Sequence, residues 1–150
     1  MTTYPTPAVI ELRVSEPASP GEPITRAADA IKVVARRLAE LDREAFVVIH
    51  LDAKNKPIAI ETISIGCLTW SVVHPREVFK GAIINGAASI IAAHNHPTGD
   101  TTPSHPDREV LRRLKQAGTL LGIPLTDFVI VGATADQPHY SAIDSREMHA

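Results

Sequence analysis

Three stretches of the chain repeat apolar residues at spacings of three and four, which is the period of an amphipathic α-helix. The first covers residues 25–41, with Thr25 as the expected N-cap. The second begins at residue 74 and ends near residue 85, with Pro75 in its first turn. The third covers residues 107–121. The pattern therefore predicts three helices spread along the chain.

Short runs rich in β-branched and other apolar residues separate these helices and predict strands. Residues 45–52 and 88–93 are almost unbroken apolar runs, typical of strands covered on both faces. Residues 57–65 would pair with the first of these as a hairpin. Further strands are expected at residues 67–73, 125–132 and 138–143. The order of elements predicts a mixed central sheet flanked by helices, in a single α/β (α+β) domain.

The N-terminal residues differ in character from the rest. Five of the twelve prolines lie within residues 1–23. Because proline cannot donate to a sheet ladder, residues 8–14 would form at most a short edge strand. The sequence therefore predicts a proline-rich arm at residues 1–23 and a folded domain at residues 24–150.

The composition is that of an ordinary soluble protein, with 44% hydrophobic and 21% charged residues. The single cysteine, Cys67, excludes a disulfide framework and a zinc site built from several thiolates. We find no secretory leader and no apolar run of about 18 residues, so a cytoplasmic protein outside the membrane is expected. A net charge of −2 and 4% aromatic residues argue against a dedicated nucleic-acid binder.

The candidate chemistry lies between His94 and Asp107. His94 and His96 are two residues apart at the end of an expected strand, so their imidazoles point the same way. Asp107 follows eleven residues after His96, and Pro97 and Gly99 bend the loop between them. Two nitrogens and one oxygen leave a fourth tetrahedral position for water, as in catalytic zinc sites. The pattern predicts one Zn²⁺ per chain.

Other interpretations of these polar residues exist. Asp100 is a competing carboxylate, nearer to the histidines in sequence. Ser104 and Asp107 also match a capping box, although a cap needs no paired histidines nearby. A zinc site also needs a carboxylate to take the proton from a water whose pKa the metal lowers to about 7. The candidates for this base are Glu44, Glu61 and Glu77.

The spacing of these residues resembles a known motif. His-x-His-Pro-x-Gly at residues 94–99, followed by Pro-Ser-x-x-Asp at residues 103–107, is similar to the JAMM motif of the JAB/MPN metalloprotease superfamily. The run His-Asn-His-Pro-Thr-Gly-Asp at residues 94–100 resembles the bacterial RadC family within it. Residues 51–55, 73–79 and 121–127 also resemble that family. The resemblance extends over about residues 25–143.

The resemblance implies a cytidine-deaminase-like JAB/MPN fold. The zinc ligands that it implies are His94, His96 and Asp107. It also implies that Ser104 polarises the substrate carbonyl and holds the oxyanion, and that Glu44 is the catalytic glutamate. Longer RadC relatives carry an N-terminal helical region of DNA-binding type. This chain is therefore expected to be the compact, JAB-only form.

Three functional hypotheses follow. The first is a zinc-dependent hydrolase of amide bonds, a metalloprotease or isopeptidase acting on a peptide or protein substrate. The second is a DNA-associated protein of RadC type, such as a metal-dependent nuclease or repair factor, which the net charge does not favour. The third is a non-catalytic MPN module that binds a partner. The sequence leaves the oligomeric state open.

Overall fold

The computed structural model describes residues 21–38, 41–66, 73–132 and 138–149, and a mixed five-stranded sheet lies at its centre. The elements in chain order are α1 (Ala27–Leu38), β1 (Ala45–Leu51), β2 (Pro57–Ile65), α2 (Pro75–Ile84), β3 (Ser89–Asn95), α3 (His105–Leu121), β4 (Leu125–Val131), β5 (Tyr140–Ser141) and the short 3₁₀ helix η1 (Glu147–His149). The predicted α/β class is confirmed. The strand expected at residues 8–14 and most of that expected at 67–73 lie outside the described residues.

The strand order is β2-β1-β3-β4-β5, which places β3 in the middle of the sheet. The hairpin partner β2 and the central strand β3 both run antiparallel to β1. β4 runs parallel to β3 and is reached through α3, while β5 pairs antiparallel with β4. In the β1–β3 pair, Phe46 lies opposite His94. The start of β1 is therefore beside the end of β3.

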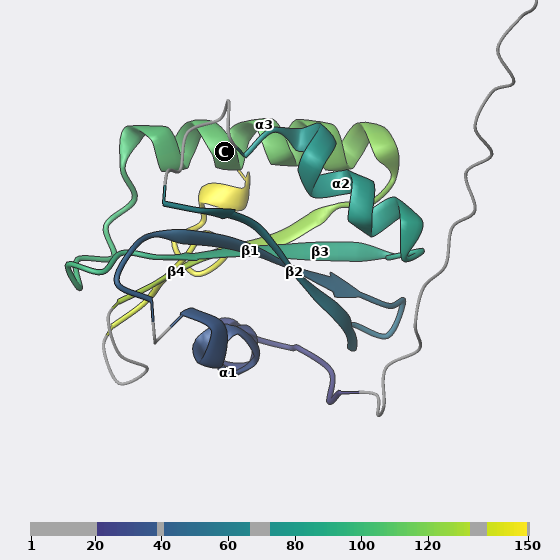
Figure 1. Ribbon diagram of the computed structural model, residues 1–150. Coiled ribbons are helices and arrows are strands. Elements are labelled where there is room, and N and C mark those ends of the chain that lie inside the picture. The colour runs from purple at the N-terminus through teal and green to yellow at the C-terminus, as the bar shows by residue number, and fades with distance from the viewer. Residues whose placement is uncertain (1–20, 39–40, 67–72, 133–137, 150) are drawn as a thin grey trace, which may run out of the picture.

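Helices cover both faces of the sheet, with α1 on one face and α2 and α3 on the other (Figure 1). Side chains alternate between the faces along each strand. On β1, Val47 and Ile49 pack with α1, whereas Phe46 and Val48 pack with α2 and α3. Burial on both faces explains why β1 and β3 are apolar along almost their whole length. His94, opposite Phe46, faces α2 and α3.

The helix ends differ in part from the sequence prediction. Thr25 is not the N-cap of α1, which begins at Ala27; the carboxylate of Asp29 instead accepts hydrogen bonds from the backbone N–H groups of Thr25 and Arg26. His74 caps α2, because its Nδ1 accepts the N–H of Arg76.

No helix within the described ranges combines the length and apolar character needed to cross a membrane.

α3 begins at His105, two residues before the predicted start. It packs closely against the chain that leads into β4, because a Cβ at Gly118 would lie 2.7 Å from the carbonyl oxygen of Ile123 and 3.1 Å from the nitrogen of Leu125. Gly122 ends the helix in the left-handed conformation that glycine adopts most readily. This packing fixes where the C-terminal end of α3 lies relative to β4.

Candidate metal centre

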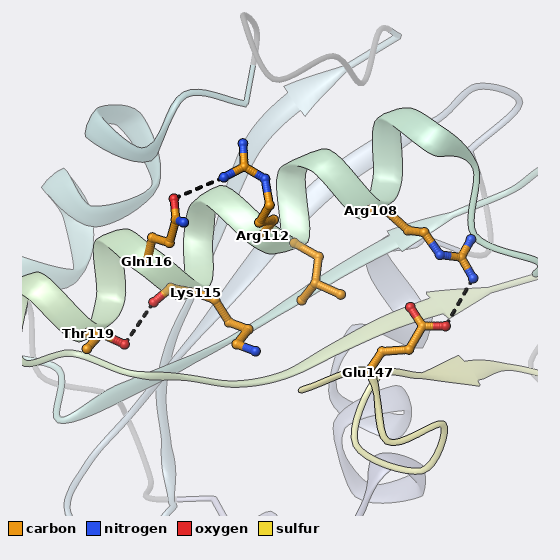
Figure 2. A pocket seen from close by; sticks show the side chains of 7 residues that line it. Arg108, Arg112, Lys115, Gln116, Thr119 and Glu147 are labelled. Carbon is orange, nitrogen blue, oxygen red and sulfur yellow. Dashed lines mark hydrogen bonds and ion pairs between the residues drawn. The ribbon is translucent and has the colours of Figure 1, made fainter. Parts of the chain in front are cut away.

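A cavity of about 780 Å³ lies along α3, but it is not where the candidate residues gather. Its basic lining residues include Arg108, Arg112 and Lys115 (Figure 2). Arg108 pairs with Glu147 at 3.0 Å, and Arg112 pairs with Glu109 of the same helix at 2.7 Å. Lys115 Nζ donates to a backbone carbonyl of η1. These cations are already engaged within the protein, so the cavity does not have the character of an open anion site.

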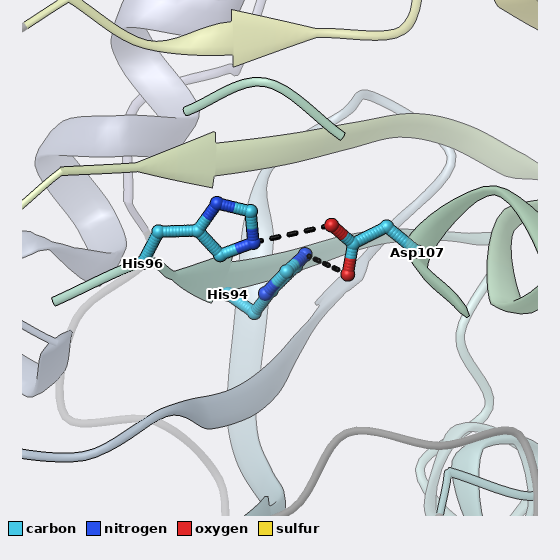
Figure 3. A group of neighbouring side chains, drawn as sticks. All are labelled: His94, His96 and Asp107. Atoms are coloured by element: carbon cyan, nitrogen blue, oxygen red, sulfur yellow. Dashed lines mark ion pairs between the residues drawn. The ribbon is translucent and has the colours of Figure 1, made fainter. Parts of the chain in front are cut away.

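The described residues that could hold a metal ion together are His94, His96 and Asp107 (Figure 3). His94 is near the end of β3, and His96 follows it, tied to β4 by a hydrogen bond from its N–H to the carbonyl of Val131. Asp107 lies in the first turn of α3. Its two carboxylate oxygens lie 3.2 Å from His94 Nε2 and 3.1 Å from His96 Nε2. The structure thus brings together the three residues that the motif nominates.

The loop between the histidines and α3 orients His96. Gly99 adopts a φ of 87° and donates its N–H to the carbonyl of His96, which turns the chain back. The backbone carbonyl of Asp100 then lies 2.7 Å from His96 Nδ1. A proton on Nδ1 makes this a hydrogen bond and leaves the lone pair on Nε2, the nitrogen that faces Asp107. The carboxylate of Asp100 accepts the N–H of Thr102 and is not in the metal-binding group.

His94 is held by aromatic rings and is almost fully buried. Its imidazole stacks on Phe46 with centroids 6.0 Å apart and meets the edge of Phe128 at 5.5 Å. The residue is 1% exposed, and neither ring nitrogen makes a hydrogen bond within the described part of the chain. Buried polar atoms normally have a partner. A metal ion at Nε2 would satisfy one of these two nitrogens.

Asp107 has two tasks at once. Its Oδ2 accepts the backbone N–H of Ser104 at 2.7 Å, while Ser104 Oγ accepts the N–H of Asp107 at 3.2 Å. The capping box is therefore formed, and it coexists with the histidine contacts instead of replacing them. Burial opposes ionisation of Asp107, but the imidazoles of His94 and His96 outweigh it and hold the pKa of this carboxyl well below its usual range. A carboxylate charged at neutral pH is the form that binds a metal.

The donor set fits a small divalent cation. Ligands at the zinc distances of 2.0–2.2 Å are separated by about 3.3–3.6 Å in a tetrahedron. The nitrogen–oxygen distances of 3.2 and 3.1 Å, each to a different oxygen of Asp107, are slightly shorter than this separation. Two imidazoles and one carboxylate, without a thiolate, also match the composition of catalytic zinc sites. The three side chains are therefore close enough together to hold a metal ion as a group.

The three candidate bases lie in different places. Glu44 is half-buried directly before β1, and its charge is among the causes that raise the pKa of His96, after the hydrogen bond with Asp107. Glu61 lies 3.4 Å from the buried His50, and Glu77 pairs with Lys80 on the outer side of α2. Of the three carboxylates, only Glu44 is among the charges that act on His96.

Sequence reasoning missed the groups that support this centre. Phe46 and Phe128 enclose His94, and the amide of Asn95 bonds to the backbone beside Glu44. All three are part of expected strands, but nothing in the strand pattern tells which of its residues support a site. The run His-Asn-His held one signal of these supporting groups. Asparagine is a poor strand former, so an asparagine at the end of a buried strand suggests a specific hydrogen-bonding role.

The fold and site define an α/β domain with a group that could bind a metal at the end of its central strand. A family model described as the RadC-like JAB domain matches residues 24–148 of this chain. The chain therefore belongs to the RadC-like JAB domain family, as its motif predicted.

Two relatives agree with this assignment. A UPF0758 protein of Caldanaerobacter subterraneus subsp. tengcongensis is 54% identical over 109 residues, which is 73% of this chain and 47% of that protein. A UPF0758 protein of Rubrobacter xylanophilus is 51% identical over 128 residues, which is 83% of this chain and 56% of that protein. The chain spans about half the length of the curated relatives that it matches.

Proposed function

We propose that this protein is a zinc-dependent hydrolase that cleaves amide bonds in peptide or protein substrates, as a metalloprotease or isopeptidase does. The observation that carries the proposal is the convergence of His94, His96 and Asp107, whose ligand atoms lie within 4.8 Å of one another. In catalytic zinc sites, three such ligands leave the fourth position for water or substrate. The ligand set thus favours a catalytic over a purely structural metal.

The residues around the group have distinct roles in this proposal. When bound, zinc would lower the pKa of a water molecule to about 7 and polarise the substrate carbonyl. Glu44 accepts the proton from that water at its carboxylate and gives it to the nitrogen of the leaving amine. Ser104 Oγ accepts the N–H of Asp107, which leaves the hydroxyl O–H of Ser104 available as a donor. This O–H donates to the oxyanion that forms on the substrate carbonyl.

Two observations favour amide hydrolysis over the DNA-associated alternative. Phosphodiester cleavage often uses two metal ions about 4 Å apart. Within the described residues a single group could hold a metal, and the carboxylate of the nearby Asp100 is bonded to Thr102. The basic residues along α3 are paired with carboxylates or carbonyls of the protein, which weakens the case for a phosphate-binding surface.

The test combines metal analysis with turnover. We expect the purified protein, reloaded with zinc, to hold about one equivalent, and to cleave at least one member of a panel of fluorogenic peptide and isopeptide substrates. Glu44→Gln should reduce cleavage to a small residual rate while zinc stays bound, and Glu77→Gln, on the outer side of α2, should leave cleavage intact. Absence of zinc binding would overturn the proposal. Zinc binding without turnover on the whole panel would favour the partner-binding module.

A further inference from the structure

Asn95 makes an unusual bridge at the end of β3. It lies between the two histidines in sequence, but strand alternation directs its side chain to the opposite face of the sheet. The residue is 2% exposed. Its Oδ1 accepts the backbone N–H of Ala45 at 2.7 Å, and its Nδ2 donates to the backbone carbonyl of Arg43 at 3.1 Å. One buried amide thus holds two main-chain groups from a segment fifty residues away.

The two main-chain groups flank Glu44 on either side. The register between β1 and β3 pairs Phe46 with His94, and Ala45 and Asn95 occupy the next position along the two strands. On the other edge, the carbonyl of Glu44 accepts the N–H of Gly66 at 2.6 Å. The backbone around Glu44 is therefore fixed from both neighbouring strands by bonds that do not involve the Glu44 side chain.

We propose that Asn95 is a positioning residue for Glu44. This inference rests on the proposed function, since it assumes that Glu44 serves the metal group. The bridge ties the Glu44 segment to β3, the strand that also carries His94 and leads into His96. The ligands and the base then share one rigid support, which keeps the carboxylate at a constant position relative to the metal.

The chemistry of the bridge requires an amide. Arg43 offers an acceptor and Ala45 offers a donor, so the bridging side chain must donate and accept at the same time. A carboxylate at position 95 could accept but not donate, and a serine hydroxyl is too short to span both groups. The burial of the site leaves little room for the additional methylene of glutamine.

The first experiment needs neither zinc nor a substrate. Hydrogen exchange measured by NMR on the metal-free protein should show Ala45 N–H exchanging at least about tenfold faster in Asn95→Ala than in the wild type. The matched control is Val131→Ala, which removes a buried side chain beside Asn95 on the β4 side, away from residues 43–45. If Asn95→Ala does not fold, Asn95→Ser replaces it, with the same expectation. Unchanged protection of Ala45 overturns the inference.

The second experiment separates positioning from general stability. Asn95→Ala should lower kcat at least about tenfold, leave zinc affinity within about threefold of the wild type, and cause no additional loss in the Glu44→Gln background. An equal loss in both backgrounds means that Asn95 does not act through Glu44 and overturns the inference. Failure of the proposed function would instead show as a lack of zinc binding or turnover in the wild type, whereas the exchange result stands by itself.

Discussion

Ser104 and Asp107 cap α3 reciprocally, with the Asp107 carboxylate 2.7 Å from the N–H of Ser104 and the Ser104 hydroxyl 3.2 Å from the N–H of Asp107. The same carboxylate faces the imidazoles of His94 and His96 at 3.2 and 3.1 Å. A residue of the first turn of α3, which takes part in the cap, is therefore also the one that meets the histidines. Helix capping sets the direction in which the carboxylate points, so it faces both imidazoles without a metal ion.

Asp107→Asn should separate the two tasks of this side chain. The amide oxygen can still accept the N–H of Ser104, so the cap is kept, but loss of the charge that faces both imidazoles should lower the free energy of unfolding without metal. The negative charge and one donor atom are lost, and zinc affinity should fall by at least about 100-fold. Competition with a fluorescent zinc chelator measures the affinity, and urea unfolding in the presence of EDTA measures the stability.

Ser104→Ala is the matched control, because it removes the hydroxyl from the cap and leaves all three candidate ligands in place. It should cost about 1 kcal/mol of stability, the usual loss for an N-cap. Zinc affinity should change only a few-fold, whereas turnover should drop if the hydroxyl donates to the oxyanion. A loss of zinc affinity as large as that of Asp107→Asn would mean that capping, and not ligation, explains the first result.

The stacking of His94 on Phe46 gives a second prediction. Phe46→Leu leaves a cavity beside the imidazole and should cost about 1–3 kcal/mol of stability. Because the ring of His94 is then less constrained, zinc affinity should fall about tenfold. Phe79→Leu is the control, since Phe79 is equally buried in the same core but is not among the rings that contact His94. Equal effects of the two variants on zinc affinity would contradict the prediction.

The sequence predicted the elements of this domain well because their signals are local. The period of α3 and the apolar run of β3 follow from burial on one or both faces, which each segment shows by itself. The exact helix ends were less predictable. Thr25 has the right chemistry for an N-cap, but the helix begins at Ala27, and the carboxylate of Asp29 reaches back to the N–H groups of Thr25 and Arg26.

The residues that hold His94 and the Glu44 segment in place could not be predicted, because their contacts depend on the register between strands far apart in the sequence. The register of β1 against β3 places Phe46 opposite His94. The same register brings Asn95 to the backbone of residues 43 and 45. No local pattern encodes this offset. The two contacts of Asp107 could not be separated for another reason: a capping box and a metal ligand can use the same residue type at the same position. In the structure the carboxylate takes part in the cap and also lies in the group that could hold a metal.

A third prediction concerns His50, which lies under α2 and is 3% exposed. Its Nε2 is 3.4 Å from Glu61 Oε2, and its Nδ1 is 3.2 Å from the amide nitrogen of Asn85. Burial lowers the pKa of His50 below its ordinary value of 6.5, so the unfolded chain binds more protons than the native one just below that pH. The stability contributed by His50 is thus present above pH 6.5 and is lost as the pH falls.

His50→Leu should therefore make the protein less sensitive to acid. Glu61 acts in the opposite sense, since burial raises the pKa of its carboxyl, so the comparison must isolate the histidine. Urea unfolding in EDTA at pH 7.5 and pH 5.5 gives the loss of stability on acidification. This loss should be smaller in His50→Leu than in the wild type, and unchanged in His139→Gln, a substitution of an exposed histidine. The same loss in all three proteins would refute the assignment.

The last prediction is that zinc affinity decreases with acid in a range set by His96. The hydrogen bond with Asp107 raises the pKa of His96 above 6.5, although burial opposes it, and the charge of Glu44 adds to the rise. Zinc must displace the proton that Nε2 would otherwise keep. Below this raised pKa the affinity should fall about tenfold per pH unit for each proton displaced.

Competition with a zinc indicator from pH 5.5 to 8.5, corrected for the protonation of the indicator itself, measures this dependence. Glu44→Gln provides an internal comparison, because it removes one negative charge that favours protonated His96. The pH at which affinity begins to fall should then be lower than in the wild type. An affinity that does not change over the whole range would show that His96 is not a ligand, and the three-residue group would lose its central nitrogen.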